Sequence, residues 1–215
     1  MKTLCALIVA SVSIASPRTV ETSFGDVFPV APTASYLKTD TSDTSASPTI
    51  INLSQLSFTV TPGTTLVLQR LGAFGATNTL PGNVDNKTTL AGVFSSSNSI
   101  LAPSNLNRVP GALDAGTDFV SEPTFFGPFS TDISQDFLID SGTYNPPVPF
   151  SSVIVQVPLG AQYLIVAPTD SFYADNVDPN GDFALSVTQT PEPASLAFLG
   201  SGVIALLMRR RGRTA

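Results

Sequence analysis

Apolar and polar residues alternate in several short stretches of this chain, and between its two ends no run of ten residues has helical periodicity. The clearest alternating stretches are residues 56–60, 153–157 and 183–188. Pro62 and Gly63 separate the first of them from residues 65–71, which predicts a hairpin. Strands with an apolar inward face and a Ser- and Thr-rich outward face suit two packed antiparallel sheets. The pattern therefore predicts an all-β fold over residues 16–189, a jelly-roll-like antiparallel β-sandwich of about eight strands.

The N-terminus has the layout of a secretory signal peptide. Lys2 supplies a positive charge, an apolar run follows, and the small side chains of Ser13 and Ala15 permit cleavage after Ala15. We expect the export machinery and signal peptidase to process residues 1–15, with a buried N-terminal strand or helix as the alternative. The single cysteine, Cys5, lies in this segment, so the exported chain would contain no disulfide.

The C-terminus combines three features in a fixed order. The triplet Pro191, Glu192 and Pro193 precedes an apolar stretch, residues 196–208, and that stretch is followed by Arg209, Arg210, Arg211 and Arg213. This thirteen-residue stretch is shorter than the roughly twenty residues that span a bilayer. Arginines directly after a hydrophobic run hold that end in the cytoplasm. The sequence thus predicts a hydrophobic stop-transfer helix that presents the triplet on the far side of the membrane.

Residues 190–215 resemble the PEP-CTERM sorting tail of Gram-negative bacteria. The resemblance rests on Glu192 between two prolines, on Ala194 and Ser195, and on the arginine cluster. It implies that an exosortase, a membrane enzyme, recognises and cuts the tail. It also implies export, transient anchoring in the inner membrane, and release to the cell surface or the extracellular space. A C-terminal anchor helix that is never cut is the alternative.

Composition narrows the possible chemistry. The chain has no His, which excludes a Ser-His-Asp triad, a Cys-His dyad and His-ligated zinc. Between the tails, five basic residues stand against fifteen acidic ones, and the resulting net charge of −10 repels nucleic acid. Asp136 and Asp140 flank residues 137–139 and are expected at strand ends. We therefore expect a protein that is not an enzyme, with a carboxylate-dependent glycosidase as a remote alternative.

One acidic loop could carry chemistry. Residues 170–182 contain four aspartates and two asparagines, and calcium is bound by carboxylate, amide and carbonyl oxygens on tight loops. The candidate calcium ligands are Asp170, Asp175, Asn176, Asp178 and Asp182. A plain turn is the alternative, because Asp, Asn, Gly and Pro are turn formers. Tyr163 and Tyr173 could stack on a sugar, or else be core or rim aromatics.

Residues 157–188 also resemble the closing strands of galactose-binding-like β-sandwich domains, which include calcium-dependent lectins. Asp170, Asp175 and Asn176 match the acidic loop of that family, whereas residues 178–182 look like an insertion. This resemblance implies a calcium-assisted carbohydrate-binding module, in which calcium would be the cofactor.

The leading hypothesis is a non-catalytic protein of the cell surface or extracellular matrix that associates with exopolysaccharide or biofilm. It rests on the two terminal signals and on the hydroxyl-rich body. Residues 39–47 are low in complexity and polar, so we expect a flexible Ser/Thr-rich surface loop there, with a glycosylated stalk as the alternative.

Overall fold

The computed structural model describes residues 25–36, 46–76, 87–105, 107–116, 133–140, 152–170 and 173–190. Several predicted features lie outside these residues: the signal peptide at 1–15, most of the Ser/Thr-rich loop, Pro191 to Pro193, and the apolar stretch with its arginines. No helix in the described part of the chain is long and apolar enough to cross a membrane.

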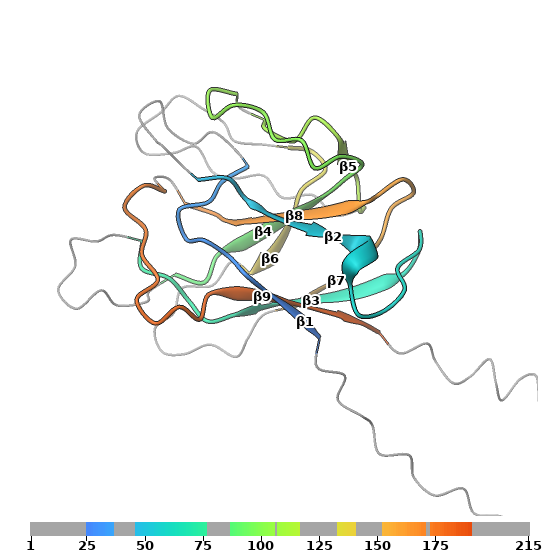
Figure 1. Ribbon diagram of the computed structural model, residues 1–215, viewed down its shortest axis with the longest axis horizontal. Helices are drawn as coiled ribbons and strands as arrows, with labels where there is room; N and C mark the ends of the chain where they lie inside the picture. The colour runs from blue at the N-terminus through green and yellow to red at the C-terminus, as the bar shows by residue number, and fades with distance from the viewer. Residues whose placement is uncertain are drawn as a thin grey trace, which may run out of the picture.

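The described residues form nine strands, arranged as two antiparallel sheets that face each other (Figure 1). The first sheet has the order β1-β9-β3-β7, with β1 at Asp26–Pro29, β9 at Ala184–Gln189, β3 at Thr65–Leu71 and β7 at Ser152–Gln156. The second has the order β2-β8-β4-β5, with β2 at Thr49–Asn52, β8 at Tyr163–Pro168, β4 at Leu90–Ser95 and β5 at Ala112–Leu113. β6, at Phe137–Asp140, also pairs with β4. The predicted all-β fold of two antiparallel sheets is confirmed.

Most connections cross from one sheet to the other. β1 and β3 lie in the first sheet, β2 and β4 in the second, and the chain alternates again through β6, β7, β8 and β9. Such crossings are typical of the Greek-key connections in β-sandwiches. The finer assignment to the jelly rolls stays a prediction.

The main core fills the space between the sheets. Alternate residues of β3 and β9 point inward, as predicted from their apolar spacing, and they pack against residues of β4, β6 and β8. The largest buried side chains in this core include Leu66, Leu68, Phe94, Phe137, Leu164 and Phe183. Because Gly92 has no side chain, the ring of Phe137 can lie close to the backbone of β4 at that point.

A second, smaller core covers the outer face of the five-stranded sheet. Val93 on β4 and Ile165 on β8 point to this side, and they pack beneath Tyr36, Val109 and Ile133 from the connecting segments. β8 is therefore buried on both faces, which explains its continuous apolar run. In contrast, the outer face of the four-stranded sheet carries partly exposed Ser, Thr and Gln residues of β3 and β9.

The predicted hairpin around Pro62 and Gly63 is wrong. A turn does form there, with Gly63 at φ 85°, but residues 56–60 are not a strand, and β3 pairs with β7 and β9 instead. Asn52 explains the difference, because its side chain accepts a hydrogen bond from Ser54 N at 3.0 Å and starts a 3-10 helix, η1, at Leu53–Gln55. Residues 56–60 still contribute apolar side chains to the core.

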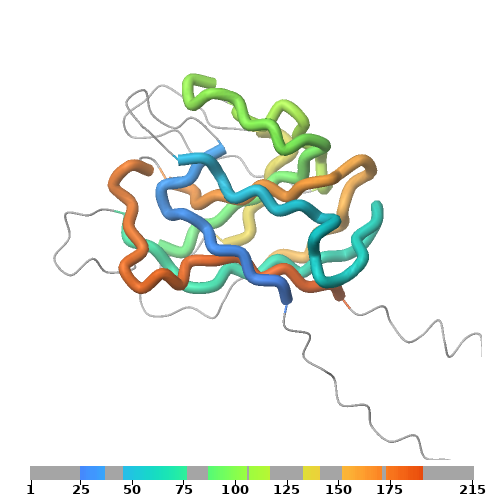
Figure 2. The backbone as a smooth tube through the Cα atoms, viewed as in Figure 1, coloured from blue at the N-terminus to red at the C-terminus, as the bar shows by residue number. Residues whose placement is uncertain are grey.

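Both ends of the described body lie at the same end of the four-stranded sheet. β1 begins at Asp26, which pairs with Val187 near the end of β9. Thr190 N donates to Thr65 O at 3.1 Å, so the chain remains attached to β3 up to that residue. Figure 2 shows the first and last strands side by side, with the first and last described residues near the same corner of the body.

Candidate functional site

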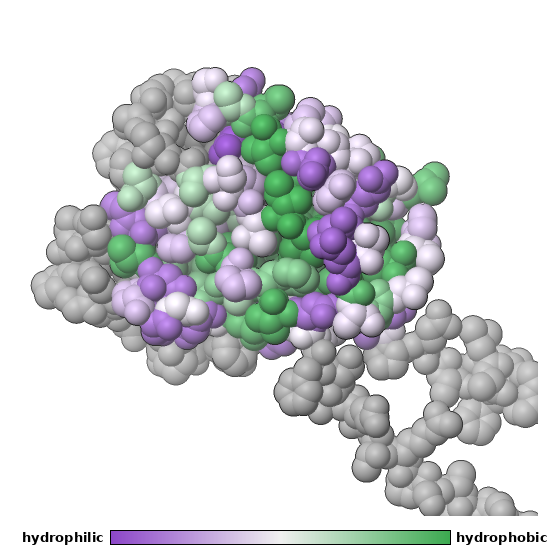
Figure 3. All heavy atoms as spheres, in the orientation of Figure 1, coloured by the Kyte–Doolittle hydropathy of each residue, from purple (hydrophilic) through white to green (hydrophobic). Residues whose placement is uncertain are grey.

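The acidic loop, residues 170–182, connects β8 to β9 at the opposite end of the sandwich from the chain ends. Its Ser171 and Phe172 lie outside the described residues. In Figure 3, hydrophilic residues lie at this end of the molecule and also on the opposite side of the view. The candidate calcium ligands thus lie in the connection from the second sheet to the first.

Two of the predicted ligands hold the backbone of the loop. The carboxylate of Asp178 accepts hydrogen bonds from Gly181 N at 2.9 Å and from Phe183 N at 3.2 Å. Asp182 Oδ1 accepts from Ala73 N at 3.1 Å, and its Oδ2 accepts from the Asn180 side chain at 3.1 Å. These contacts are those of turn-forming residues, in line with the plain-turn alternative for this half of the loop.

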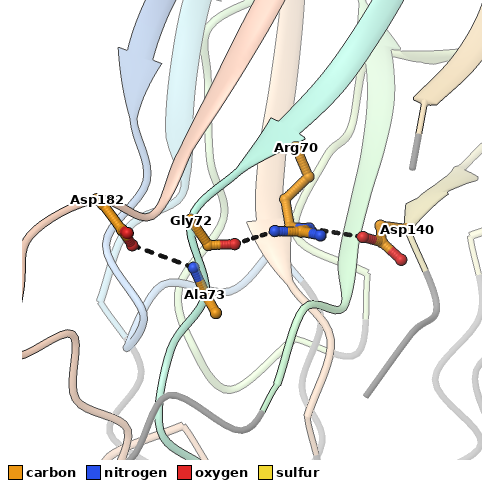
Figure 4. A network of polar contacts seen from close by, with 5 residues as sticks. All are labelled: Arg70, Gly72, Ala73, Asp140 and Asp182. Carbon is orange, nitrogen blue, oxygen red and sulfur yellow. Dashed lines mark hydrogen bonds and ion pairs between the residues drawn. The ribbon is translucent and has the colours of Figure 1, made fainter. Parts of the chain in front are cut away.

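Asp182 also ties the loop to the end of β3 (Figure 4). Its neighbour there is Gly72, whose φ is 63° and whose absent Cβ would lie 2.1 Å from Asp182 Oδ1. Both the left-handed backbone and the close approach require glycine at this position. The contact fixes the second half of the acidic loop to the first sheet.

The other half of the loop contains buried oxygens without hydrogen-bond donors. Asn176 is 4% exposed, and its Nδ2 donates to Pro32 O at 3.0 Å. Asn176 Oδ1 and Asp175 Oδ1 are buried and have no hydrogen-bond partner. Within the described ranges, no three acidic, His or Cys side chains gather closely enough to hold a metal ion. Asp175 and Asn176 thus lie together, whereas Asp178 and Asp182 are engaged elsewhere.

Tyr173 lies in the interior. It is 2% exposed, and its hydroxyl oxygen accepts a hydrogen bond from Asp170 N at 3.3 Å. A ring at this position has no face available to a sugar, so Tyr173 has the place of a core aromatic, the alternative to its predicted role.

A buried polar cluster, which sequence analysis did not predict, lies beside Tyr173. Tyr36 donates its hydroxyl hydrogen to Asp136 Oδ2 at 3.3 Å, and both residues are almost fully buried. Burial raises the pKa of Tyr36 well above its ordinary value, and the nearby charge of Asp136 adds to this effect. The cluster connects the segment before the Ser/Thr-rich loop to the start of β6.

Two arginines are buried as well. Arg70 on β3 donates from Nε to Asp140 Oδ2 on β6 at 2.6 Å, and its Nη1 also donates to Gly72 O (Figure 4). Arg108 donates from Nε to Leu101 O at 3.0 Å and from Nη1 to Ser35 O, and burial lowers its pKa. Asp136 directly precedes β6 and Asp140 is its last residue, so both lie at strand ends as predicted, but both are buried.

A pocket of about 310 Å³ opens at the other end of the sandwich, where η1 follows β2 and the β7–β8 turn begins. Tyr163 lines this pocket and is only half-buried, unlike Tyr173. The other polar lining residues are Asn52, Ser54, Thr61 and Gln162, and buried Leu53 and Val157 are among the apolar ones. Sequence analysis gave no signal for this pocket beyond Tyr163.

Comparison with protein-family models identifies a PEP-CTERM protein-sorting motif at residues 189–211. The match begins at Gln189, the last residue of β9, and continues beyond the described residues. The motif indicates an exported protein that is targeted to an exosortase, which confirms the predicted sorting tail. Neither a search of curated proteins nor a search of solved structures finds a match. The likeness to galactose-binding-like domains therefore stays a hypothesis.

Proposed function

We propose that this protein is a non-catalytic component of the cell surface or extracellular matrix, trimmed at both ends and retained with exopolysaccharide. The observation that carries this proposal is the sorting motif, which starts at the last described strand of the two-sheet body. The tail would anchor the precursor in the inner membrane until an exosortase cuts it. The strongly acidic body then disfavours nucleic acid as a partner.

The contacts of three of the described carboxylates favour a structural role for them over a catalytic one. A glycosidase needs two carboxyl groups that face each other across a cleft, about 5 to 10 Å apart. Asp140 is engaged by Arg70, while Asp178 and Asp182 accept backbone hydrogen bonds. The pocket near Tyr163 has no carboxylate in its lining.

Mass spectrometry of the native product tests the sorting proposal. We expect a chain that starts near Ser16 and ends near residues 190–193. A Glu192→Ala variant should keep its C-terminal arginines, because the glutamate of the sorting triplet is lost, whereas Glu122→Ala should be trimmed normally. Secreted wild-type protein with residues 209–213 intact would refute C-terminal processing.

A calcium-assisted carbohydrate-binding module is the second candidate. It is favoured by the buried oxygens of Asp175 and Asn176, because a buried oxygen without a donor costs about 1–3 kcal/mol, which a cation could offset. Thermal melts with calcium or a chelator test it. We expect Asp175→Asn to lose a calcium-dependent rise in Tm that the turn variant Asp178→Asn retains. If calcium does not change the Tm of the wild-type protein, this candidate is ruled out.

A further inference from the structure

The pocket beside Tyr163 is uncharged in an otherwise acidic protein. Its lining consists of amide, hydroxyl, aromatic and aliphatic residues, with no Asp, Glu, Lys or Arg among them. The body as a whole carries a net charge of −10. A charged ligand would find no counter-ion in this pocket, so the chemistry of the lining selects a neutral one.

Several polar groups in the pocket have unused hydrogen-bonding capacity. Asn52 Oδ1 accepts from both Ser54 N and Ser54 Oγ, at 3.0 and 2.8 Å, which orients the amide and leaves its Nδ2 available. Among the described residues, neither the Gln162 side chain nor the Tyr163 hydroxyl makes a hydrogen bond. Amides and hydroxyls donate as well as accept, and a sugar hydroxyl requires partners of both kinds.

The wall of the pocket is held rigidly by the backbone. Leu53 N donates to Gln162 O at 3.0 Å, and Gln162 N donates to Ser95 O at 2.9 Å. Gly63 N donates to Val157 O at 2.8 Å on the side of the turn. A framework fixed before binding loses less conformational entropy when a ligand arrives. The volume, about 310 Å³, is at the lower end of the range for small-molecule pockets.

We propose that this pocket binds a short segment of a neutral saccharide. Gln162 and Asn52 supply hydrogen bonds to hydroxyl groups, and Tyr163 contributes both an aromatic surface and a hydroxyl. The inference rests on the proposed matrix function and gives it a specific point of contact with glycan. The site lies at the opposite end of the sandwich from the acidic loop, and it requires no calcium.

Isothermal titration of the full-length protein with neutral oligosaccharides tests the proposal, using cello-, malto- and galacto-oligosaccharides as probes and oligogalacturonide as the charged comparison. We expect at least one neutral probe to bind in the presence of a chelator. Gln162→Ala should weaken its binding about tenfold, the effect of losing one or two hydrogen bonds. Tyr163→Phe, which removes only the hydroxyl, should weaken it less. The matched control is Gln156→Ala on β7, an exposed glutamine outside the pocket, which should bind normally.

Several outcomes would overturn the saccharide site. These are binding of no neutral probe, preference for the charged probe, equal binding by Gln162→Ala and the control, and capture of peptides instead of sugars. Equal melting curves for the variants and the wild type would show that a loss of binding does not result from unfolding. The termini of the native product are measured independently, so a failed pocket leaves the sorting proposal intact, and a failed sorting proposal leaves the titration interpretable.

Discussion

Local features of single residues determine where the buried charged side chains of this sandwich lie. Arg70 follows Leu66 and Leu68 on the inward face of β3, so the alternation that predicts the strand also places an arginine in the core. The alternation of Phe137 and Ile139 would direct Asp140 outward. Instead, the register of β6 against β4 shifts between Leu90 and Ala91, and Asp140 reaches Arg70. Such a shift leaves no mark in the sequence, which is why the buried pair could not be predicted.

Because of Tyr36, the free energy of unfolding should depend on pH in the alkaline range. Its pKa is raised in the folded state, so the folded protein holds the phenolic proton at pH values where the unfolded chain has lost it. The free energy of unfolding should therefore fall above about pH 10, by at most about 1.4 kcal/mol per pH unit for this group. Urea denaturation between neutral pH and about pH 11 measures this.

The variant for this test, Tyr36→Phe, differs from the wild type by one hydroxyl group. Tyr36→Phe should be less stable at neutral pH by about 1 kcal/mol, because it loses the hydrogen bond to Asp136, and its stability should fall less steeply above pH 10. An identical alkaline slope in the wild type and Tyr36→Phe would contradict the assignment.

At the level of elements, the longer strands were predictable and the shorter ones were not. Residues 65–71 form β3 as predicted, and the apolar run that starts at Tyr163 forms β8. β1 and β2 have only four residues each, too few for their alternation to stand out. Residues 56–60 alternate without pairing, because η1 has already turned the chain away from a hairpin.

The candidate sites, too, were predictable from the sequence only in part. The acidic loop was located by composition, but composition does not reveal which oxygen accepts from which backbone amide. Asp178 and Asp175 look alike in the sequence, yet one caps a turn and the other carries a buried oxygen without a donor. The pocket is assembled from η1, two turns and β8, so only its aromatic residue gave a signal.

The ion pair between β3 and β6 joins the two sheets, and it yields a prediction for this pair of elements. Arg70→Met or Asp140→Leu alone should lower the free energy of unfolding by about 3–5 kcal/mol, because each leaves a buried charge without its ionic partner. The double variant should cost much less than the sum. Chemical denaturation of all four proteins completes the cycle, and additive losses would show that the two residues are not coupled.

At the scale of the whole molecule, the sorting motif directly adjoins the folded body. It begins within β9, and Thr190 is still hydrogen-bonded to β3. A membrane enzyme that acts near Pro191 must therefore work close to the packed sheet. We predict that a flexible ten-residue Gly/Ser spacer between Thr190 and Pro191 speeds C-terminal trimming, measured by pulse-chase labelling.

The same spacer placed after Gly116, an exposed glycine beyond β5, is the control for added length. It should leave the trimming rate unchanged, since it does not separate the body from the tail. If the spacer at Thr190 leaves the rate unchanged or lowers it, closeness to the sheet does not limit the enzyme.

That the described body begins and ends at the same end of the first sheet has a geometric consequence for the precursor. If the body is attached to the bilayer at that end, the acidic loop at the opposite end points away from the membrane. The pocket beside Tyr163 lies at the attached end, so it would face the lipid head groups until the tail is cut. Cleavage of the tail would then expose the pocket, which the membrane covers in the anchored precursor.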